Sequence, residues 1–259
     1  MSNELVTYVL ERGIAIITID NPPMNPITVS VREKIISILD ELELKKDQLR
    51  VAIITGKGKA FIAGADIKSF QELTQEKARD RLKRSRLMYQ KLENFEKPLI
   101  CAINGYCLGA GLELALCCDL RIVCSGAMLG QPEINVGVIP GGGGTQRLPR
   151  LVGIGIAKEL IFTGELINAE SAARIGLVNK VVEAEKLLEE AMELAKLIAS
   201  KPPLAIRAAK EAINRGLNMS LAEGLELEAY HWSYLCGTED QKEGARAFIE
   251  KRKAIFAGR

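Results

Sequence analysis

Histidine is almost missing from this sequence, since His231 is the only one among 259 residues. The six cysteines include no Cys-x-x-Cys pair, and five of them have apolar neighbours. Zinc sites and disulfide frameworks need such closely spaced ligands, so we expect no metal site and interpret the cysteines as reduced core residues. His231 falls in a helical segment near the C-terminus, a poor location for a Ser-His-Asp triad. The sequence predicts a cytoplasmic protein.

Neither sign of charge is in excess. Lysine and arginine total 35 against 33 acidic residues, which gives a formal net charge of +2, and no basic run stands out. Nucleic-acid-binding surfaces need clustered lysine and arginine, so nucleic acid is not expected as a partner. A small polyanion needs only a few local cations and stays possible as a ligand.

The sequence shows neither a signal peptide nor a clear membrane span. Residues 1–10 lack the basic and apolar regions of a signal peptide. The most apolar window, 98–118, contains Asn104, Glu113 and three glycines. It divides into strand, turn and helix more naturally than it forms one span, so no membrane partner is expected.

Apolar runs and helical periods alternate along the first part of the chain. The runs that predict strands are 13–20, 51–55, 98–103, 120–123 and 178–182. Between them, 31–44 has one apolar face, whereas 72–94 is more charged and is expected to be exposed. This alternation favours an α/β core.

The C-terminal part has only helical patterns. Helices are predicted over 185–200, 203–216, 220–235 and 238–256, and Pro203 suits a helix start. We therefore divide the chain into an α/β core, 1–195, and a helical region, 196–259. The last helix has an apolar stripe that includes Phe248 and Ile249 and needs a partner, either within the chain or in another subunit. No internal sequence repeat is visible.

Three glycine-rich stretches have charged residues where a core would not. The first, 61–67, reads Phe-Ile-Ala-Gly-Ala-Asp-Ile and follows a predicted strand. Glycine there allows a close turn that leaves amides free for a ligand. The alternative is an ordinary loop with Asp66 as a helix N-cap, and on this stretch alone the alternative is favoured.

The second stretch, 104–116, places Gly109, Ala110 and Gly111 before a helix that carries Glu113 in its first turn. Amides around Ala110 would lie at the positive end of the helix dipole. Leucines flank Glu113, and burying a lone carboxylate is costly unless it is paired, protonated or functional. A first-turn glutamate that faces water is the alternative.

The third stretch runs from 130 to 148. Glu133 sits beside apolar residues in a loop stiffened by Pro132, and four consecutive glycines follow at 141–144. Four glycines are expensive to order, which indicates a close approach of the backbone to another group. A flexible surface loop is the alternative, and the apolar residues that flank the glycines argue against it.

Other motifs fit these stretches poorly. A dinucleotide fingerprint starting at Gly109 would need a third glycine where Leu114 stands. Thr-Gln-Arg follows the four glycines instead of Gly-Lys-Ser/Thr, so they are not a phosphate-binding Walker loop. No Gly-x-Ser-x-Gly elbow is present.

In order along nearly the whole chain, these stretches resemble the enoyl-CoA hydratase (crotonase) family. The matching segments are 60–67, 97–98, 104–113, 119–121, 130–133, 139–148, 176–178 and 247–253. Both glutamate positions of the true hydratases are kept, as Glu113 and Glu133. Within the family, the sequence most resembles the short-chain bacterial hydratases, also called 3-hydroxybutyryl-CoA dehydratases.

The resemblance implies an α/β spiral of β-β-α units followed by an all-helical trimerisation region that also forms part of the coenzyme A pocket. It implies a homotrimer or a dimer of trimers. The amides of Ala65 and Ala110 would form the oxyanion hole. The residues implied to bind substrate or coenzyme A are Ala63, Gly64, Asp66, Ile67, Lys68, Gly109, Gly141, Phe248 and Lys251. The family often has glycine at the position of Ala110, and a different pattern at 25–27, which borders the coenzyme A pocket.

The implied reaction is the reversible hydration of short-chain trans-2-enoyl-CoA thioesters to 3-hydroxyacyl-CoA. Glu113 would deprotonate water, Glu133 would protonate the α-carbon, and no cofactor is needed beyond the coenzyme A of the substrate. Two alternatives stay open: a Δ3,Δ2-enoyl-CoA isomerase of the same fold, and a binding protein without catalytic activity.

Overall fold

Two β-sheets form the centre of the computed structural model, which describes residues 4–45 and 47–259. Within these residues the larger sheet has the strand order β1-β2-β3-β5-β7-β10 and the smaller sheet the order β4-β6-β8-β9. The large-sheet strands are β1 Val6–Glu11, β2 Ile14–Ile19, β3 Val51–Gly56, β5 Leu99–Ile103, β7 Leu120–Cys124 and β10 Lys180–Val182. The small-sheet strands are β4 Ala60–Ile62, β6 Tyr106–Leu108, β8 Met128–Gly130 and β9 Ile167–Asn168. Pairing is parallel except for β1 with β2 and β8 with β9.

From β3 to β8 the chain winds as a spiral in which each turn contributes one strand to each sheet. After β3 and β4 comes α2, Gln75–Glu93, and after β5 and β6 comes α3, Ala110–Cys117. The next turn begins with β7 and β8. This confirms the expected β-β-α spiral. The repeat lies in the path of the backbone, because the helices and loops of successive turns differ too much in length to leave a sequence repeat.

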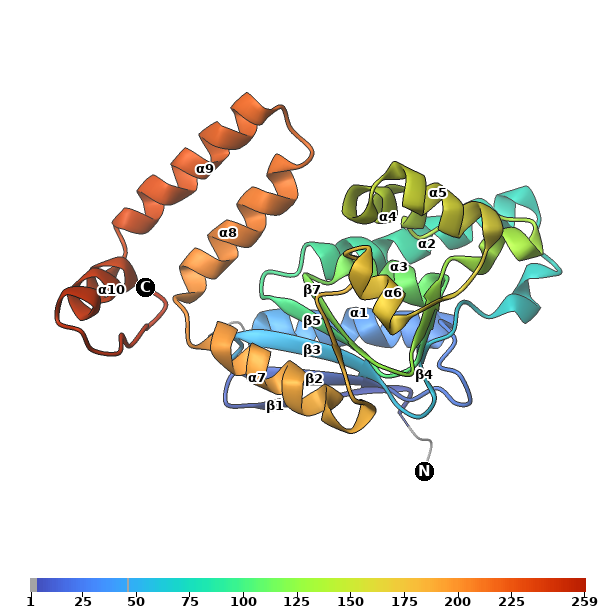
Figure 1. Cartoon of the computed structure of the whole chain (residues 1–259), viewed down its shortest axis with the longest axis horizontal. Helices are drawn as coiled ribbons and strands as arrows, with labels where there is room; N and C mark the ends of the chain where they lie inside the picture. The colour runs from blue at the N-terminus through green and yellow to red at the C-terminus, as the bar shows by residue number, and fades with distance from the viewer. Residues whose placement is uncertain (1–3, 46) are drawn as a thin grey trace.

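The large sheet is covered by helices, which explains its continuous apolar strands. β3 and β5 are buried almost throughout, as parallel strands between two layers should be. Helix α1, Val29–Leu44, buries the predicted apolar face that includes Ile35 and Leu39. Helix α7, Leu187–Ala199, packs on β2, β3, β5 and β7 (Figure 1).

The remaining elements of the core are short helices. They are the 3-10 helices η1 Ile67–Phe70, η2 Pro132–Val136 and η3 Ala184–Lys186, with α4 Gly144–Val152, α5 Ile154–Thr163 and α6 Ala169–Arg174. The apolar window 98–118 contains the predicted strand and helix as β5 and α3, and the strand β6 lies between them where only a turn was predicted. No helix among the described residues is long and apolar enough to cross a membrane.

Three C-terminal helices project from the core (Figure 1). Helices α8, Pro203–Gly216, and α9, Leu221–Cys236, pack against each other, and α10, Glu239–Ile249, follows. The start of α8 at Pro203 agrees with the prediction. The predicted division at 195/196 falls within α7, which packs on the large sheet.

The predicted last helix, 238–256, is wrong at its C-terminal end, because α10 stops at Ile249. Lys251 has a φ of 54°, which breaks the helical path. The chain then folds back, and the amides of Ala257 and Gly258 donate to the buried carboxylate of Asp240 at 2.6 and 2.9 Å. The tail is therefore tied to the first turn of α10 and does not extend it.

Candidate active site

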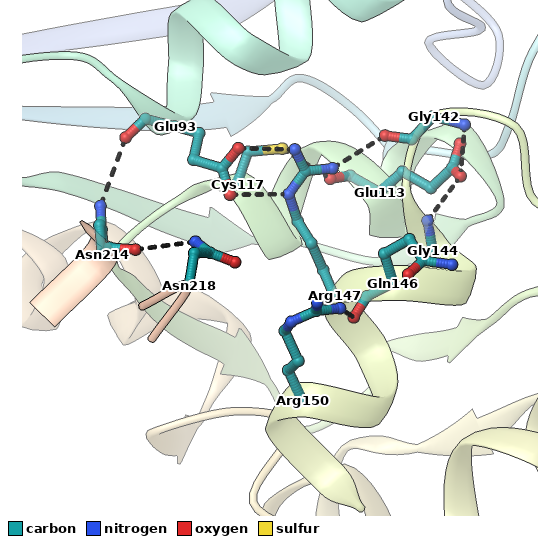
Figure 2. A network of polar contacts seen from close by, with 10 residues as sticks. All are labelled: Glu93, Glu113, Cys117, Gly142, Gly144, Gln146, Arg147, Arg150, Asn214 and Asn218. Atoms are coloured by element: carbon teal, nitrogen blue, oxygen red, sulfur yellow. Dashed lines mark hydrogen bonds and ion pairs between the residues drawn. The ribbon is translucent and has the colours of Figure 1, made fainter. Parts of the chain in front are cut away.

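Glu113 lies in the first turn of α3 with its carboxyl group close to the four-glycine stretch (Figure 2). Only 3% of the residue is exposed, so the alternative in which it faces water is wrong. Its Oε1 accepts hydrogen bonds from the N–H groups of Gly142, at 2.6 Å, and Gly144, at 2.9 Å. The buried carboxyl group thus finds its hydrogen-bond partners among backbone amides rather than in a neighbouring cation.

The four-glycine stretch approaches its neighbours as closely as its composition indicated. A Cβ atom on Gly142 would collide with the ring of Tyr89 and would lie 2.5 Å from Oε2 of Glu113. A Cβ atom on Gly141 would lie 2.7 Å from Cδ2 of Leu82 on α2. The stretch is therefore held against α2 and α3, and the alternative of a flexible surface loop is wrong.

Glu133 stands in the first turn of η2, close to the start of α3. A Cβ atom on Gly109 would lie 3.0 Å from its Oε1, so the glycine leaves room for the carboxyl group. Gln131 is fully buried beside it. With its amide nitrogen turned toward Glu133, Gln131 donates to both carboxyl oxygens at 3.1 Å. Glu133 is thus oriented by a neighbouring side chain.

The two carboxyl groups hold protons more tightly than exposed glutamates do. Burial raises the pKa of Glu133 to about 7; its own amide opposes that shift and the nearby Glu113 adds to it. Burial also raises the pKa of Glu113, against the amides of Gly144 and Gly142 and the charge of Arg147. Glu133 can therefore exchange a proton near neutral pH, while Glu113 has the donors that favour an ionised carboxylate.

The proposed oxyanion-hole residues are brought to one place. Ala110 is the first residue of α3, so its N–H has no partner within the helix. A Cβ atom on Gly111 would collide with the carbonyl oxygen of Ile62, so α3 begins directly against the end of β4. A Cβ atom on Gly64 would lie 3.8 Å from the carbonyl oxygen of Leu108. The segment that contains Ala65 therefore runs beside the start of α3.

Residues 24–27 brace this segment from behind. The N–H of Ala63 donates to the carbonyl of Met24 at 3.0 Å, and the N–H of Ile27 donates to that of Gly64 at 2.9 Å. Ile27 also pairs with Ala65 in a parallel β-bridge. The unusual pattern at 25–27 therefore supports the backbone of the site.

The other implied binding residues fall into two groups. Ala63, Gly64 and Asp66 are partly buried, and Ile67, which begins η1, is exposed. The side chain of Lys68 lies outside the described part of the structure. Phe248 and Lys251 lie on and just after α10, at the far end of the projection, and the chain does not bring them to the carboxyl groups (Figure 1).

Sequence reasoning missed two residues of the site. The helix containing Tyr89 was expected to be exposed, yet its C-terminal end buries Met88, Tyr89 and Leu92. The Tyr89 hydroxyl donates to the carbonyl of Ala110 at 3.4 Å. The spacing of these three apolar residues was the available signal. Gln131 could have been noticed as a polar residue between Gly130 and Pro132 in an otherwise apolar context.

The arrangement defines a site for acid–base chemistry. It combines two carboxyl groups of raised pKa with the Ala110 amide, which has no partner within its helix and lies at the helix start, where negative charge on a substrate oxygen would be favoured. No group of three or more His, Cys, Asp or Glu side chains in the described chain is placed to hold a metal ion.

Comparison with known proteins agrees with a site for acid–base chemistry. The family model described as enoyl-CoA hydratase/isomerase matches residues 10–259. A crotonyl-CoA hydratase of Syntrophomonas wolfei is 44% identical over 99% of both chains. A short-chain-enoyl-CoA hydratase of Clostridium acetobutylicum is 44% identical over 96% of this chain and 97% of its own. The chain belongs to the enoyl-CoA hydratase/isomerase family, as its motifs predicted.

Solved structures of this family share the fold. The crystal structure of an enoyl-CoA hydratase from Bacillus anthracis superimposes with a TM-score of 0.94 at 40% identity, covering 98% of this chain and all of the other. The crotonase-like fold that the motifs implied is thereby confirmed.

Proposed function

We propose that this enzyme catalyses the reversible hydration of short-chain trans-2-enoyl-CoA thioesters to 3-hydroxyacyl-CoA. The observation that carries the proposal is the convergence of Glu113 and Glu133 at the start of α3. The relatives named as crotonyl-CoA and short-chain-enoyl-CoA hydratases support the substrate class. Coenzyme A enters only as part of the substrate, and no other cofactor is required.

In the proposed mechanism the thioester carbonyl oxygen binds to the amides of Ala65 and Ala110. Conjugation makes the β-carbon electrophilic when the charge that develops on this oxygen is stabilised, and each amide donor contributes up to about 3–4 kcal/mol. Glu113 removes a proton from water as the oxygen attacks the β-carbon. Glu133 gives its proton to the α-carbon.

The environments of the two glutamates suit this division of roles. Glu113 accepts two amide hydrogen bonds, which favour its ionised form as a base. Glu133 has a pKa of about 7 because of burial, so its protonated form is available as an acid near neutral pH.

The test is an absorbance assay that follows loss of the enoyl-thioester band of crotonyl-CoA. Activity is expected without added nicotinamide, flavin or metal, and a chelator should have no effect. Glu113→Gln and Glu133→Gln should each lower kcat by roughly 10²–10⁴ while substrate affinity stays within about tenfold. The double variant should be far less impaired than the product of the single effects, since both groups handle one water.

Two outcomes would contradict the proposal. A Gln variant that hydrates crotonyl-CoA at close to the parental rate would remove the mechanism. Rapid interconversion of 3-enoyl and 2-enoyl isomers without hydration would assign the site to an isomerase, an activity that appears in the name of a 40% identical relative from Mycosarcoma maydis, an enoyl-CoA isomerase/hydratase.

A further inference from the structure

The partly buried guanidinium group of Arg147 lies next to the four-glycine stretch (Figure 2). Arg147, in the first turn of α4, donates through Nε and Nη2 to the two carboxylate oxygens of Glu93 at 3.0 and 2.7 Å. Its Nη1 donates to the carbonyl of Gly142 at 2.9 Å. The Arg147 side chain is only 19% exposed. A two-pronged pair of this kind fixes the plane of the guanidinium group as well as its position.

Gly142 is held from both sides. Its carbonyl accepts from Arg147, and its N–H donates to Glu113 at 2.6 Å. A Cβ atom on Gly143, whose φ is 115°, would collide with Nη1 of Arg147. The glycines therefore leave room for the guanidinium group on one side and the carboxyl group on the other.

Glu93 anchors the guanidinium group from a different element. It is the last residue of α2, and Asn214 of α8 donates to its main-chain carbonyl at 3.5 Å. Glu93 thus belongs to the helix that contains Tyr89 and also contacts the projecting helix α8. A shift of Arg147 would need a shift of this helix end too.

We propose that Arg147, held by Glu93, is a positioning residue that fixes the Gly142 amide against Glu113. The proposal rests on the proposed function for the role of Glu113 as base. Arg147 touches no reacting atom in this arrangement. Its contribution is the orientation and ionisation of a group that does.

The first test compares Arg147→Gln with Arg150→Gln. Arg150 lies on the same helix but is exposed, and among the described residues its side chain donates only to the carbonyl of Gln146. With crotonyl-CoA, Arg147→Gln should lower kcat by roughly 10–100-fold with KM within about threefold, because a misplaced donor costs rate more than binding. Arg150→Gln should keep the parental kcat. Glu93→Gln should lower kcat less than Arg147→Gln does. Arg147→Lys keeps the charge but not the two-pronged geometry of the guanidinium group, so its kcat should lie between those of Arg147→Gln and the parent.

A second measurement does not depend on turnover. Carboxyl signals of protein labelled with 13C-glutamate are titrated by NMR, and the signal lost in Glu113→Gln identifies Glu113. Its titration should move to higher pH in Arg147→Gln and stay unchanged in Arg150→Gln. If the parental protein did not hydrate crotonyl-CoA, the proposed function would fail while this titration still judged the role of Arg147. An Arg147→Gln protein that melts at a lower temperature but has the parental kcat and Glu113 titration would overturn the inference.

Discussion

At the scale of single residues, the two glutamates share one proton during the proposed reaction. Hydration starts with Glu113 ionised and Glu133 protonated, whereas dehydration starts with the proton on Glu113. Both starting forms hold one proton in the pair, so they have the same dependence on pH. The pH profile is therefore a property of the pair.

We expect kcat/KM to be bell-shaped and to decline as pH rises through about 7, where Glu133 loses its proton. The same profile should appear for hydration and dehydration. Crotonyl-pantetheine serves as the control substrate, because it lacks the phosphate groups of coenzyme A, which titrate near pH 6. A rate that is flat from about pH 5 to 9 with this substrate would remove Glu133 as the acid.

The Glu133 carboxyl group should also make the folded protein less stable as the pH rises above the acidic range. The folded state keeps the Glu133 proton up to about pH 7, whereas an unfolded glutamate releases it near pH 4.5, so unfolding is increasingly favoured as pH rises through this window. Replacement of Glu133 by Gln removes this titration. Urea unfolding at matched protein concentration measures the free energy of unfolding of the variant minus that of the parent. This difference should be about 1–2 kcal/mol larger at pH 8 than at pH 5, after allowance for partial exposure. If variant and parent differed in free energy of unfolding by the same amount at both pH values, the raised pKa of Glu133 would be contradicted.

At the scale of elements, Asn25 supports the glycine-rich stretch 61–67, which contains Ala65. It is buried with a φ of 52°, and its Nδ2 donates to the carbonyls of Lys57 and Ala60 at 2.9 and 2.7 Å. Its Oδ1 accepts from the N–H of Asn21 at 2.8 Å. One side chain therefore joins the turn between β3 and β4 to the segment that braces Ala65.

Asn25→Ala should lower the free energy of unfolding by about 2–4 kcal/mol, because backbone groups would be left without partners in the interior. Asn25→Gly adopts the left-handed φ without strain and also lacks the amide, so it separates the two contributions. We expect both variants to be destabilised in chemical denaturation, Ala by the larger amount. A loss below about 0.5 kcal/mol in both would show that these hydrogen bonds are dispensable.

The elements that the sequence predicted well are those with a long, unambiguous pattern. β3 and β5 are almost entirely apolar, and α8 begins at a proline and has a helical period. The strands β1, β4, β6, β8 and β9 were missed. β4, β6, β8 and β9 have only two or three residues each, too few to show a period. The two glutamates stood out because their neighbours are apolar. Their partners did not, because a backbone amide such as that of Gly144 has no signature of its own.

At the scale of the whole molecule, the projecting helices lack cover. Helix α9 has no buried residue in the described chain. Large apolar side chains are exposed along the projection: Ile213, Leu217, Leu221, Leu225, Tyr230, Trp232, Phe248 and Ile249. An apolar surface of this extent favours association. The family resemblance implies that the assembly is a trimer or a dimer of trimers, and we expect this state in solution.

Light scattering should return three or six times the chain mass of 28.3 kDa. Trp232 is the only tryptophan and is 71% exposed in the single chain, so it reports on the same surface. If assembly covers α9, its emission should be that of a buried indole and should shift to the red on dissociation by dilution or mild denaturant. A scattering mass of 28.3 kDa at micromolar concentration would contradict the assembly.

The strand order of the large sheet also bears on how the chain is made. From β2 onward, β3, β5, β7 and β10 join the sheet in the order in which they occur in the sequence. As the chain leaves the ribosome, each new strand can dock on the edge formed by the previous one, so the sheet can grow in the direction of synthesis. The edge of β7 then waits for β10, more than 50 residues later, because these strands span Leu120–Cys124 and Lys180–Val182. During that interval an apolar strand edge is open to other chains, which makes it the point at which a nascent chain needs protection from aggregation.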